Sequence, residues 1–189
     1  MSHKMYLFLA DGFEEVEALT PADYLRRAGI DVKLVSISGN KTVTGANNIQ
    51  VSADILIGDV PPLSSEDGII LPGGGQGAVN LAASTSFDAL LKKSIASSAL
   101  ICAICAAPAI VLASKGILDG RKWTCYPGLE KDAGKAKETW LADRVVVDGN
   151  IISSRAPGTA AEWSIKIIEK LLGAKAASKV AGDVLLPVV

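Results

Sequence analysis

Apolar runs alternate with amphipathic segments along most of the chain. Four runs have the length and composition of buried strands, at residues 5–9, 32–37, 68–71 and 99–104. The segments at 14–28, 77–96 and 106–115 carry apolar residues at helical spacing. Continuous apolar strands alternating with helices are typical of a parallel sheet covered on both faces. The pattern therefore predicts a single α/β domain over residues 1–189.

The remaining segments predict hairpins and one more helix. Residues 40–57 are polar and rich in turn formers, with β-branched residues between, which predicts short hairpin strands at a sheet edge or beyond it. Residues 144–147 and 151–154 flank an Asp-Gly turn, which predicts a second hairpin. Thr159 and Glu162 have the spacing of a capping box before a last amphipathic helix, which Gly173 ends.

Composition narrows the classes of partner. Lys and Arg total 19 against 20 Asp and Glu, so the chain lacks the basic excess of a protein that binds nucleic acid or an anionic membrane. The first apolar run is too short for a signal segment or a membrane span. We therefore expect a cytoplasmic protein whose partners are small molecules.

The three cysteines are expected to be reduced thiols, because an odd number in a chain of this size does not suggest a disulfide framework. Cys102 lies within a predicted strand, so we interpret it as a core residue rather than the partner of Cys105 in a redox C-x-x-C pair. Cys125 follows a short strand-like segment and is a candidate resolving or accessible thiol. No metal is expected, since the only histidine is His3 and the cysteines show no zinc spacing.

Cys105 stands where an apolar strand passes directly into a predicted helix. This is the arrangement of a nucleophile elbow, in which a strained turn presents the reactive side chain. A helix N-terminus lowers the pKa of a thiol, so we expect Cys105 to titrate below the ordinary value. The alternative is a buried core cysteine.

Three consecutive glycines, Gly73 to Gly75, follow the strand at 68–71. Their amides, with that of Ala106, could form an oxyanion hole beside Cys105. The same glycines match a dinucleotide-binding pattern, but they follow an internal strand and no acidic residue ends a second strand downstream. We therefore expect no nucleotide cofactor.

Glu17 lies one turn into the first predicted helix, at the border of its apolar stripe. Partial burial would raise the pKa of this carboxyl, which could then donate a hydrogen bond to a neighbouring thiolate or exchange a proton with a bound carbonyl. Glu14 and Glu15 fall outside the stripe. The alternative for Glu17 is simple complementation of the helix dipole.

Four motifs resemble the ThiJ/PfpI superfamily and, within it, the branch of Parkinson disease protein seven (DJ-one) and its bacterial relatives. They are ADGFEEVE at 10–17, LPGG at 71–74, AICAAP at 103–108 and SRAPGT at 154–159, and the similarity extends over about 5–182. The resemblance implies a flavodoxin-like (class I glutamine amidotransferase-like) three-layer sandwich, usually a homodimer. It also implies a reactive Cys105, a protonated Glu17 as its hydrogen-bond partner, pocket amides at Gly74 and Ala106, and Arg155 near the dimer interface.

Members of this branch are described as glyoxalases or deglycases that act on methylglyoxal and as oxidative-stress sensors, and older labels name thiazole biosynthesis or intracellular proteolysis. Tyr126 stands where many relatives have histidine, so the Cys-His pair of a protease is absent. A basic residue that some relatives have near Asn47 is also missing, which disfavours anionic substrates. The leading hypothesis is a cofactor-free enzyme acting on a reactive carbonyl. The alternatives are a redox sensor or chaperone-like protein and a structural dimer with a vestigial site.

Overall fold

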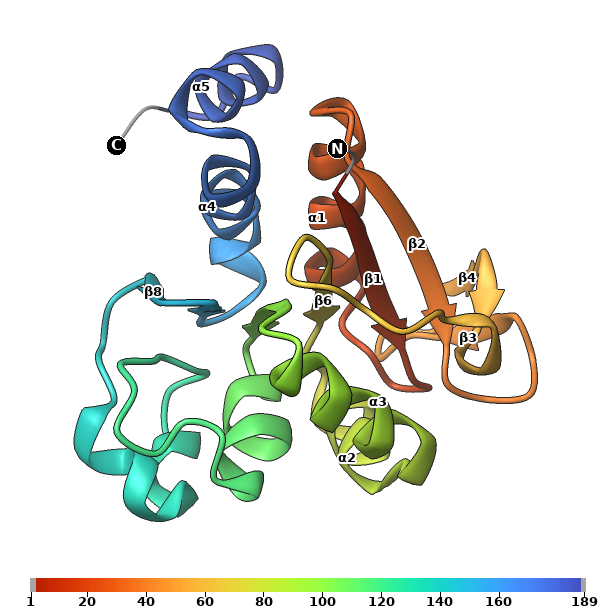
Figure 1. Cartoon of the computed structure of the whole chain (residues 1–189), viewed down its shortest axis with the longest axis vertical. Coiled ribbons are helices and arrows are strands. Elements are labelled where there is room, and N and C mark those ends of the chain that lie inside the picture. Colours follow the sequence, from red (N-terminus) through yellow and green to blue (C-terminus); the bar gives the residue numbers. More distant parts are fainter. Residues whose placement is uncertain (1–2, 188–189) are drawn as a thin grey trace.

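A seven-stranded sheet forms the centre of the computed structural model, which describes residues 3–187 (Figure 1). The strand order is β5-β2-β1-β6-β7-β9-β8, and every neighbouring pair is parallel except β8 and β9. The strands are β1 (Lys4–Leu9), β2 (Asp31–Ser36), β5 (Ile55–Leu56), β6 (Gly68–Leu71), β7 (Leu100–Ile104), β8 (Val145–Asp148) and β9 (Ile151–Ser154). Helices cover both faces, so the predicted flavodoxin-like three-layer fold is confirmed.

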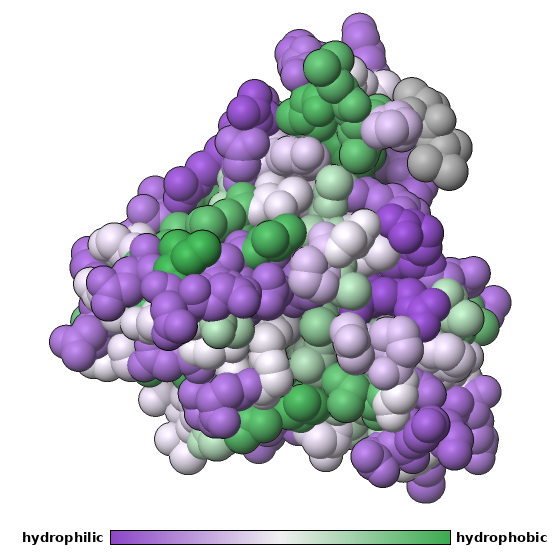
Figure 2. All heavy atoms as spheres, turned by 180° about the vertical axis from the view of Figure 1, so that it is seen from behind, coloured by the Kyte–Doolittle hydropathy of each residue, from purple (hydrophilic) through white to green (hydrophobic). Residues whose placement is uncertain are grey.

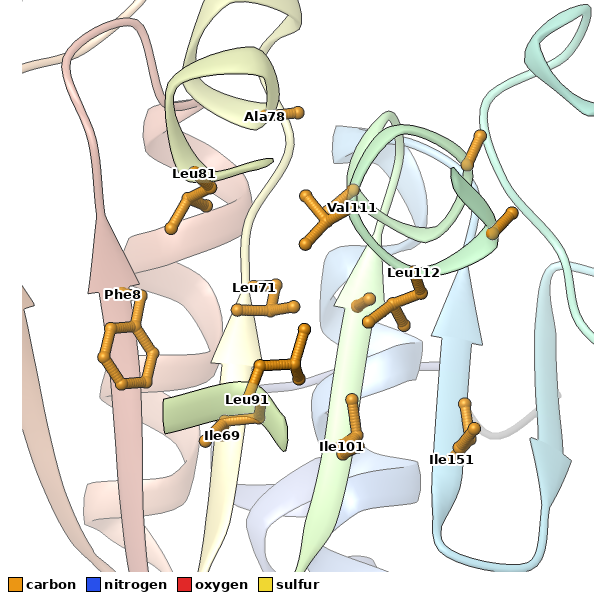
Figure 3. Packing of buried hydrophobic residues seen from close by; sticks show 14 of the residues in the cluster. Phe8, Ile69, Leu71, Ala78, Leu81, Leu91, Ile101, Val111, Leu112 and Ile151 are labelled. Atoms are coloured by element: carbon orange, nitrogen blue, oxygen red, sulfur yellow. The ribbon is translucent and has the colours of Figure 1, made fainter. Parts of the chain in front are cut away.

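Successive side chains of each strand enter opposite cores, because a strand has a side-chain period of two. Figure 3 shows one core, to which β1 contributes Phe8, β6 contributes Ile69 and Leu71, β7 contributes Ile101 and β9 contributes Ile151. It is covered by α2 (Gly75–Ala83) and α3 (Thr85–Ala96). Phe87 of α3 meets Phe8 edge to face, with ring centroids 5.1 Å apart.

The second core lies between the sheet and the helices α1 (Glu15–Arg27), α4 (Ala160–Leu172) and α5 (Ala174–Asp183). Alternate residues of β1, such as Leu7, pack there against α1 and α4. Trp163 is fully buried in this core, and its indole donates to the Ile152 carbonyl. Burial of continuous apolar strands on both faces explains the near absence of polar residues in β1, β6 and β7.

Both predicted hairpins are confirmed. β3 (Thr42–Thr44) and β4 (Gln50–Ser52) pair antiparallel in a separate two-stranded sheet beside the end of β2 (Figure 1). β8 and β9 form the second hairpin, with Gly149 in the left-handed region at φ 60°. Gly173 ends α4 with φ 85°, as predicted.

The predicted capping box at α4 is wrong. The Thr159 side chain makes no cap bond to α4, because its hydroxyl binds the loop before the helix. Glu162 instead forms an ion pair with Arg144, with 2.7 Å between Oε2 and Nε. α5 was not predicted from the sequence.

The segment after Cys105 is also less regular than predicted. It turns through a π-helical stretch, η2 (Pro108–Leu112), and a 3₁₀ turn, η3 (Ala113–Lys115), instead of one α-helix. Gly116 ends it in the left-handed region, as expected for a C-cap. The other short helical turns are η1 (Ile57–Asp59), η4 (Leu129–Asp132), η5 (Gly134–Thr139) and η6 (Pro157–Thr159).

On the face opposite to that of Figure 1, polar residues separate several hydrophobic patches (Figure 2). None of the helices within residues 3–187 combines the length and the hydropathy needed to cross a bilayer.

Candidate functional site

Three adjacent strands deliver the candidate site residues to one edge of the sheet. The carboxyl ends of β1, β6 and β7 lead to α1 with Glu17, to Gly73 and to Cys105, respectively. The chain reverses its direction of strand addition at β1, which pairs with β2 on one side and β6 on the other. Crevices at such a switch point are the usual ligand sites of open α/β sheets.

Cys105 has a left-handed backbone with φ 62°, which confirms the strained turn. Such a conformation costs a non-glycine residue about 1–3 kcal/mol and persists only where the surroundings fix it. Two hydrogen bonds hold the backbone of Cys105 in place. The Cys105 amide donates to the Ser154 carbonyl at 3.0 Å, and the Cys105 carbonyl accepts from the Tyr126 amide at 2.8 Å. The side chain is half-buried between the two cores.

The backbone amides of Gly74 and Ala106 donate toward the Cys105 sulfur. The two amides thus lie where the sequence predicted them. The Gly73 amide does not join them, because it donates to Oε2 of Glu17 at 2.8 Å. The predicted oxyanion role of Gly73 is therefore wrong, and Gly75, as the first residue of α2, has no described contact with the sulfur.

Only glycine fits at position 73. A Cβ there would lie 2.7 Å from the Cys105 Cβ and 2.7 Å from Oε2 of Glu17. Real Cβ atoms do not approach neighbours so closely. The missing side chain therefore lets the thiol and the carboxyl meet across the backbone of Gly73.

Glu17 is fully buried. Its Oε1 has no partner with hydrogen-bond geometry among the described residues, although the Cys105 thiol is close enough to act on the carboxyl. Burial raises the pKa of Glu17 to about 7, against the lowering effect of the Gly73 amide and of Cys105, and nearby Glu14 raises it further. Glu17 is thus a buried carboxyl with a pKa near neutrality rather than a surface charge at a helix end.

The prediction that Cys105 has a low pKa is wrong when Glu17 beside it is ionised. Burial and the charge of Glu17 raise the pKa of Cys105 to about 12, although the amides of Gly74 and Ala106 lower it. Two interacting groups titrate as a pair. The pair therefore loses its first proton near neutrality, and the charge of Glu17 then opposes loss of the second proton from Cys105.

The other two cysteines are fully buried. Cys102 packs in the core of α1 and α4, as predicted, and burial raises its pKa. The prediction that Cys125 is an accessible thiol is wrong, since its side chain has no exposed surface and packs in the core of α2 and α3. Burial raises the pKa of Cys125 to about 12, and Glu130 raises it further.

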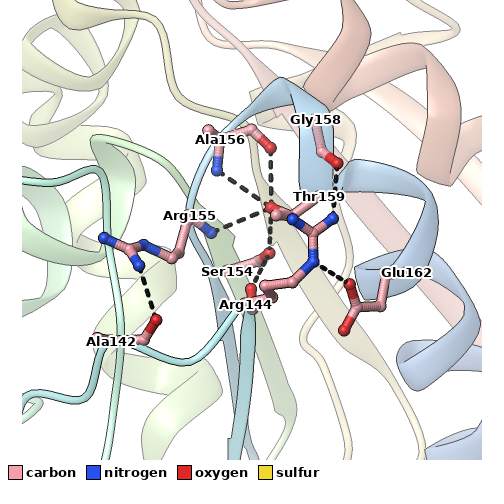
Figure 4. Close-up of polar contacts among 8 residues, drawn as sticks. All are labelled: Ala142, Arg144, Ser154, Arg155, Ala156, Gly158, Thr159 and Glu162. Carbon is pink, nitrogen blue, oxygen red and sulfur yellow. Dashed lines mark hydrogen bonds and ion pairs between the residues drawn. The ribbon is translucent and has the colours of Figure 1, made fainter. Parts of the chain in front are cut away.

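Tyr126 is about half exposed and joins the site through its backbone bond to Cys105. Arg155 donates to the Ala142 carbonyl at 2.7 Å (Figure 4). Its guanidinium carbon also lies 5.8 Å from the centroid of the Trp140 ring. The structure contains one copy of the chain, so a role of Arg155 between two copies stays a prediction.

Sequence reasoning missed Glu15, which was assigned to the outward face of α1. Its side chain is buried under the β3–β4 hairpin and accepts hydrogen bonds from Asn47 and from the Ile49 amide. The helical pattern could not show this, because the covering loop lies about thirty residues away.

Within residues 3–187, no three His, Cys, Asp or Glu side chains gather in a group that could hold a metal ion. The site therefore consists of a thiol, a carboxyl and two backbone amides. Such a set can form a covalent bond to an electrophilic carbon and move a proton next to it.

Known proteins share this arrangement of elements. Residues 3–170 match the model of the DJ-1/PfpI family. Protein DJ-1 homolog B of Arabidopsis thaliana is 38% identical over 97% of the chain, which spans only 41% of that relative. A protein named as a deglycase from Pyrococcus abyssi is 32% identical, over 89% of the chain and 99% of the relative. The crystal structure of Drosophila melanogaster DJ-1beta superposes with a TM-score of 0.89 at 34% identity, covering 100% of both chains. The chain belongs to the DJ-1/PfpI family.

Proposed function

We propose that the protein is a cysteine-dependent, cofactor-free enzyme of the glyoxalase or deglycase type that acts on methylglyoxal or on groups that methylglyoxal has glycated. The observation that carries the proposal is the pairing of a reachable thiol with a buried carboxyl whose pKa lies near neutrality. General acid–base catalysis works best when the pKa of the catalytic group is close to the working pH. The deglycase name of the Pyrococcus abyssi relative supports the same class.

Each group has one part in the proposed reaction. The Glu17 carboxylate takes the proton of the Cys105 thiol, the sulfur bonds to the aldehyde carbon of methylglyoxal, and Glu17 passes the proton to the aldehyde oxygen, which yields a hemithioacetal. The Glu17 carboxylate then takes the proton from that carbon and returns it to the neighbouring carbon, while the proton of the new hydroxyl moves to the former ketone oxygen, which leaves a thioester. Water cleaves the sulfur–carbon bond of the thioester, releases lactate and restores the thiol. The amides of Gly74 and Ala106 stabilise negative charge on the sulfur.

Lactate formation from methylglyoxal, without added cofactor, tests the proposal. Cys105→Ser should abolish turnover, whereas Cys125→Ser should retain it, because Cys125 is buried away from solvent. Both variants remove one sulfur, so the comparison separates chemistry from general loss of a thiol. Equal rates for wild type and Cys105→Ser would contradict the proposal.

A redox sensor is the second candidate, and the difference in exposure among the thiols favours it. Cys105 is half-buried, while Cys102 and Cys125 have no exposed surface. Mild peroxide should therefore add oxygens at Cys105 first. Peptide mapping by mass spectrometry that found the oxygens on Cys125 would contradict this candidate.

We also propose that two copies pair through the outer face of α1. Val16 and Leu19 lie one turn apart on this helix and are 47% and 39% exposed, and Ile49 of the adjacent hairpin is 53% exposed. Neighbouring apolar side chains on a surface mark interaction sites. Val16→Glu should shift the mass measured by light scattering to that of a monomer, while an unchanged dimer would place the interface elsewhere.

A further inference from the structure

Buried hydroxyl groups gather on one side of the Cys105 turn. Ser153 and Ser154, at the end of β9, have no exposed surface, and Thr159 is 4% exposed. Buried polar groups are costly unless they are hydrogen-bonded, so a cluster of them requires a physical reason. We call these three residues the hydroxyl cluster.

Ser154 and Thr159 fix the backbone that receives the Cys105 amide. The two hydroxyls lie 2.7 Å apart, and the Ser154 hydroxyl donates to the Arg144 carbonyl at 2.8 Å (Figure 4). The Thr159 hydroxyl also accepts from the amides of Arg155 and Ala156. The loop after β9 is thereby tied to the start of β8, and the Ser154 carbonyl is held where the Cys105 amide meets it.

Ser153 fixes the backbone that binds the other side of the same residue. Neighbouring residues of a strand point to opposite faces, so Ser153 and Ser154 serve different partners. The Ser153 hydroxyl accepts from the Thr124 amide at 2.9 Å. Two residues later, the Tyr126 amide donates to the Cys105 carbonyl. Both polar groups of the Cys105 backbone therefore depend on partners that the hydroxyl cluster anchors.

We propose that Ser153, Ser154 and Thr159 are positioning residues that hold Cys105 in its left-handed conformation and so keep the Ala106 amide directed at the sulfur. The hydroxyl cluster does not touch the thiol, and it acts through the Ser154 carbonyl and the Tyr126 amide. The proposal deepens the proposed function, since it rests on Cys105 as the reactive group. It predicts that removal of a single hydroxyl changes the thiol while the fold stays intact.

Ser153→Ala is the first test, with Ser164→Ala as its matched control. Ser164 is also fully buried, and its hydroxyl makes one hydrogen bond, to the Ala160 carbonyl within α4. Ser153→Ala should raise the hydrogen-exchange rate of the Tyr126 amide and slow iodoacetamide labelling of Cys105 at pH 7 by about tenfold. The pH midpoint of labelling should rise, because the sulfur loses the fixed amide that stabilises its charge. Ser164→Ala should change none of these quantities.

Thr159→Val and Thr159→Ser form the second test. Valine keeps the shape and removes the hydroxyl, whereas serine keeps the hydroxyl, so Thr159→Val should slow labelling and Thr159→Ser should restore it. This pair also decides the case if Ser153→Ala fails to fold. The proposal is overturned if the midpoint and the exchange rates stay at wild-type values, if Ser164→Ala shifts them equally, or if labelling merely accelerates at an unchanged midpoint.

The two proposals can fail separately. If wild-type Cys105 resists labelling while Cys125 is labelled, the proposed function is wrong. The exchange rates of the Cys105 and Tyr126 amides still test the hydroxyl cluster in that case, because they do not depend on a reactive thiol.

Discussion

Two buried carboxyl groups of α1 show opposite behaviour although they are two residues apart. Glu15 accepts from the Asn47 amide at 2.8 Å, from the Asn47 side chain at 2.8 Å and from the Ile49 amide at 3.4 Å. Glu17 accepts one hydrogen bond, from Gly73, and its Oε1 lacks a partner among the described residues. Burial alone raises the pKa of both groups, but the hydrogen bonds to Glu15 lower its pKa overall, and the pKa of Glu17 rises to about 7.

The difference distinguishes a carboxylate that stabilises the fold from a carboxyl whose pKa suits proton transfer. Donors arranged around Glu15 hold it ionised and fasten the β3–β4 hairpin to the start of α1. Few donors and a neighbouring thiol leave Glu17 free to exchange its proton near neutrality. Perturbed carboxyls of the second kind are typical of catalytic sites.

The largest expected effect is on turnover. Glu17→Gln keeps the shape of the side chain but removes its exchangeable proton, so methylglyoxal conversion should fall by about 10²–10⁴-fold. Cys105 should remain oxidisable in this variant. Glu66→Gln is the control, because it removes one carboxylate from a site before β6, at the opposite edge of the sheet. Equal, small losses in both variants would reduce Glu17 to an electrostatic role.

The second prediction concerns the pH dependence of stability. Because folding raises the pKa of Glu17 from 4.5 to about 7, the unfolded state loses this proton first as the pH rises. The contribution of Glu17 to the free energy of unfolding should therefore fall between about pH 4.5 and 7, by at most about 3 kcal/mol. Urea unfolding across this range should show the slope in wild type and lose it in Glu17→Gln.

Glu15 should give a pH dependence of stability with the opposite sign, since folding lowers its pKa. Its stabilising contribution is complete above the unfolded value of 4.5 and is lost as the pH falls through the lower folded value. A Glu15→Gln variant that retained the full loss of stability in acid would show that other carboxyls cause it.

The third prediction is that, at neutral pH, Glu15→Gln loses more stability than Glu17→Gln. Glu15→Gln places an amide group among donors, so one buried donor loses its acceptor, at a cost of about 1–3 kcal/mol. Glu17→Gln should cost less or nothing at pH 7, because a neutral amide replaces a carboxyl that burial disfavours in its charged form. Urea unfolding of both variants at one pH measures the contrast directly. The reverse order of stabilities would contradict the assignment of the two roles.

The sequence alone predicted the parallel sheet, because strands buried on both faces are continuous apolar runs. It also placed Cys105 in a strained turn, since strand and helix patterns meet there without a loop. It failed where contacts are distant in the chain. Asn47 covers Glu15, so local spacing could not show that this carboxylate is buried. Gly73 donates to Glu17 across 56 positions, so local spacing could not show that the Gly73 amide binds the carboxyl instead of the sulfur. The capping-box spacing of Thr159 misled for the same reason, because Ser154 and the loop amides take its hydroxyl.

The smallest expected effect comes from Glu14, which acts on Glu17 through charge alone. Its carboxylate raises the pKa of Glu17, and this is the least of the causes that shift it. Glu14→Gln removes a negative charge near the pair, so ionisation of Glu17 becomes easier and its pKa should fall, by less than about one unit. The limb of the pH–rate profile that follows Glu17 should move to lower pH by the same amount. Because Glu14 is only partly buried, salt should screen its charge, and the difference between variant and wild type should shrink at high ionic strength. A shift that salt leaves unchanged would mean that Glu14 acts through the backbone bond between its amide and the Gly73 carbonyl, and hence through the geometry of the site.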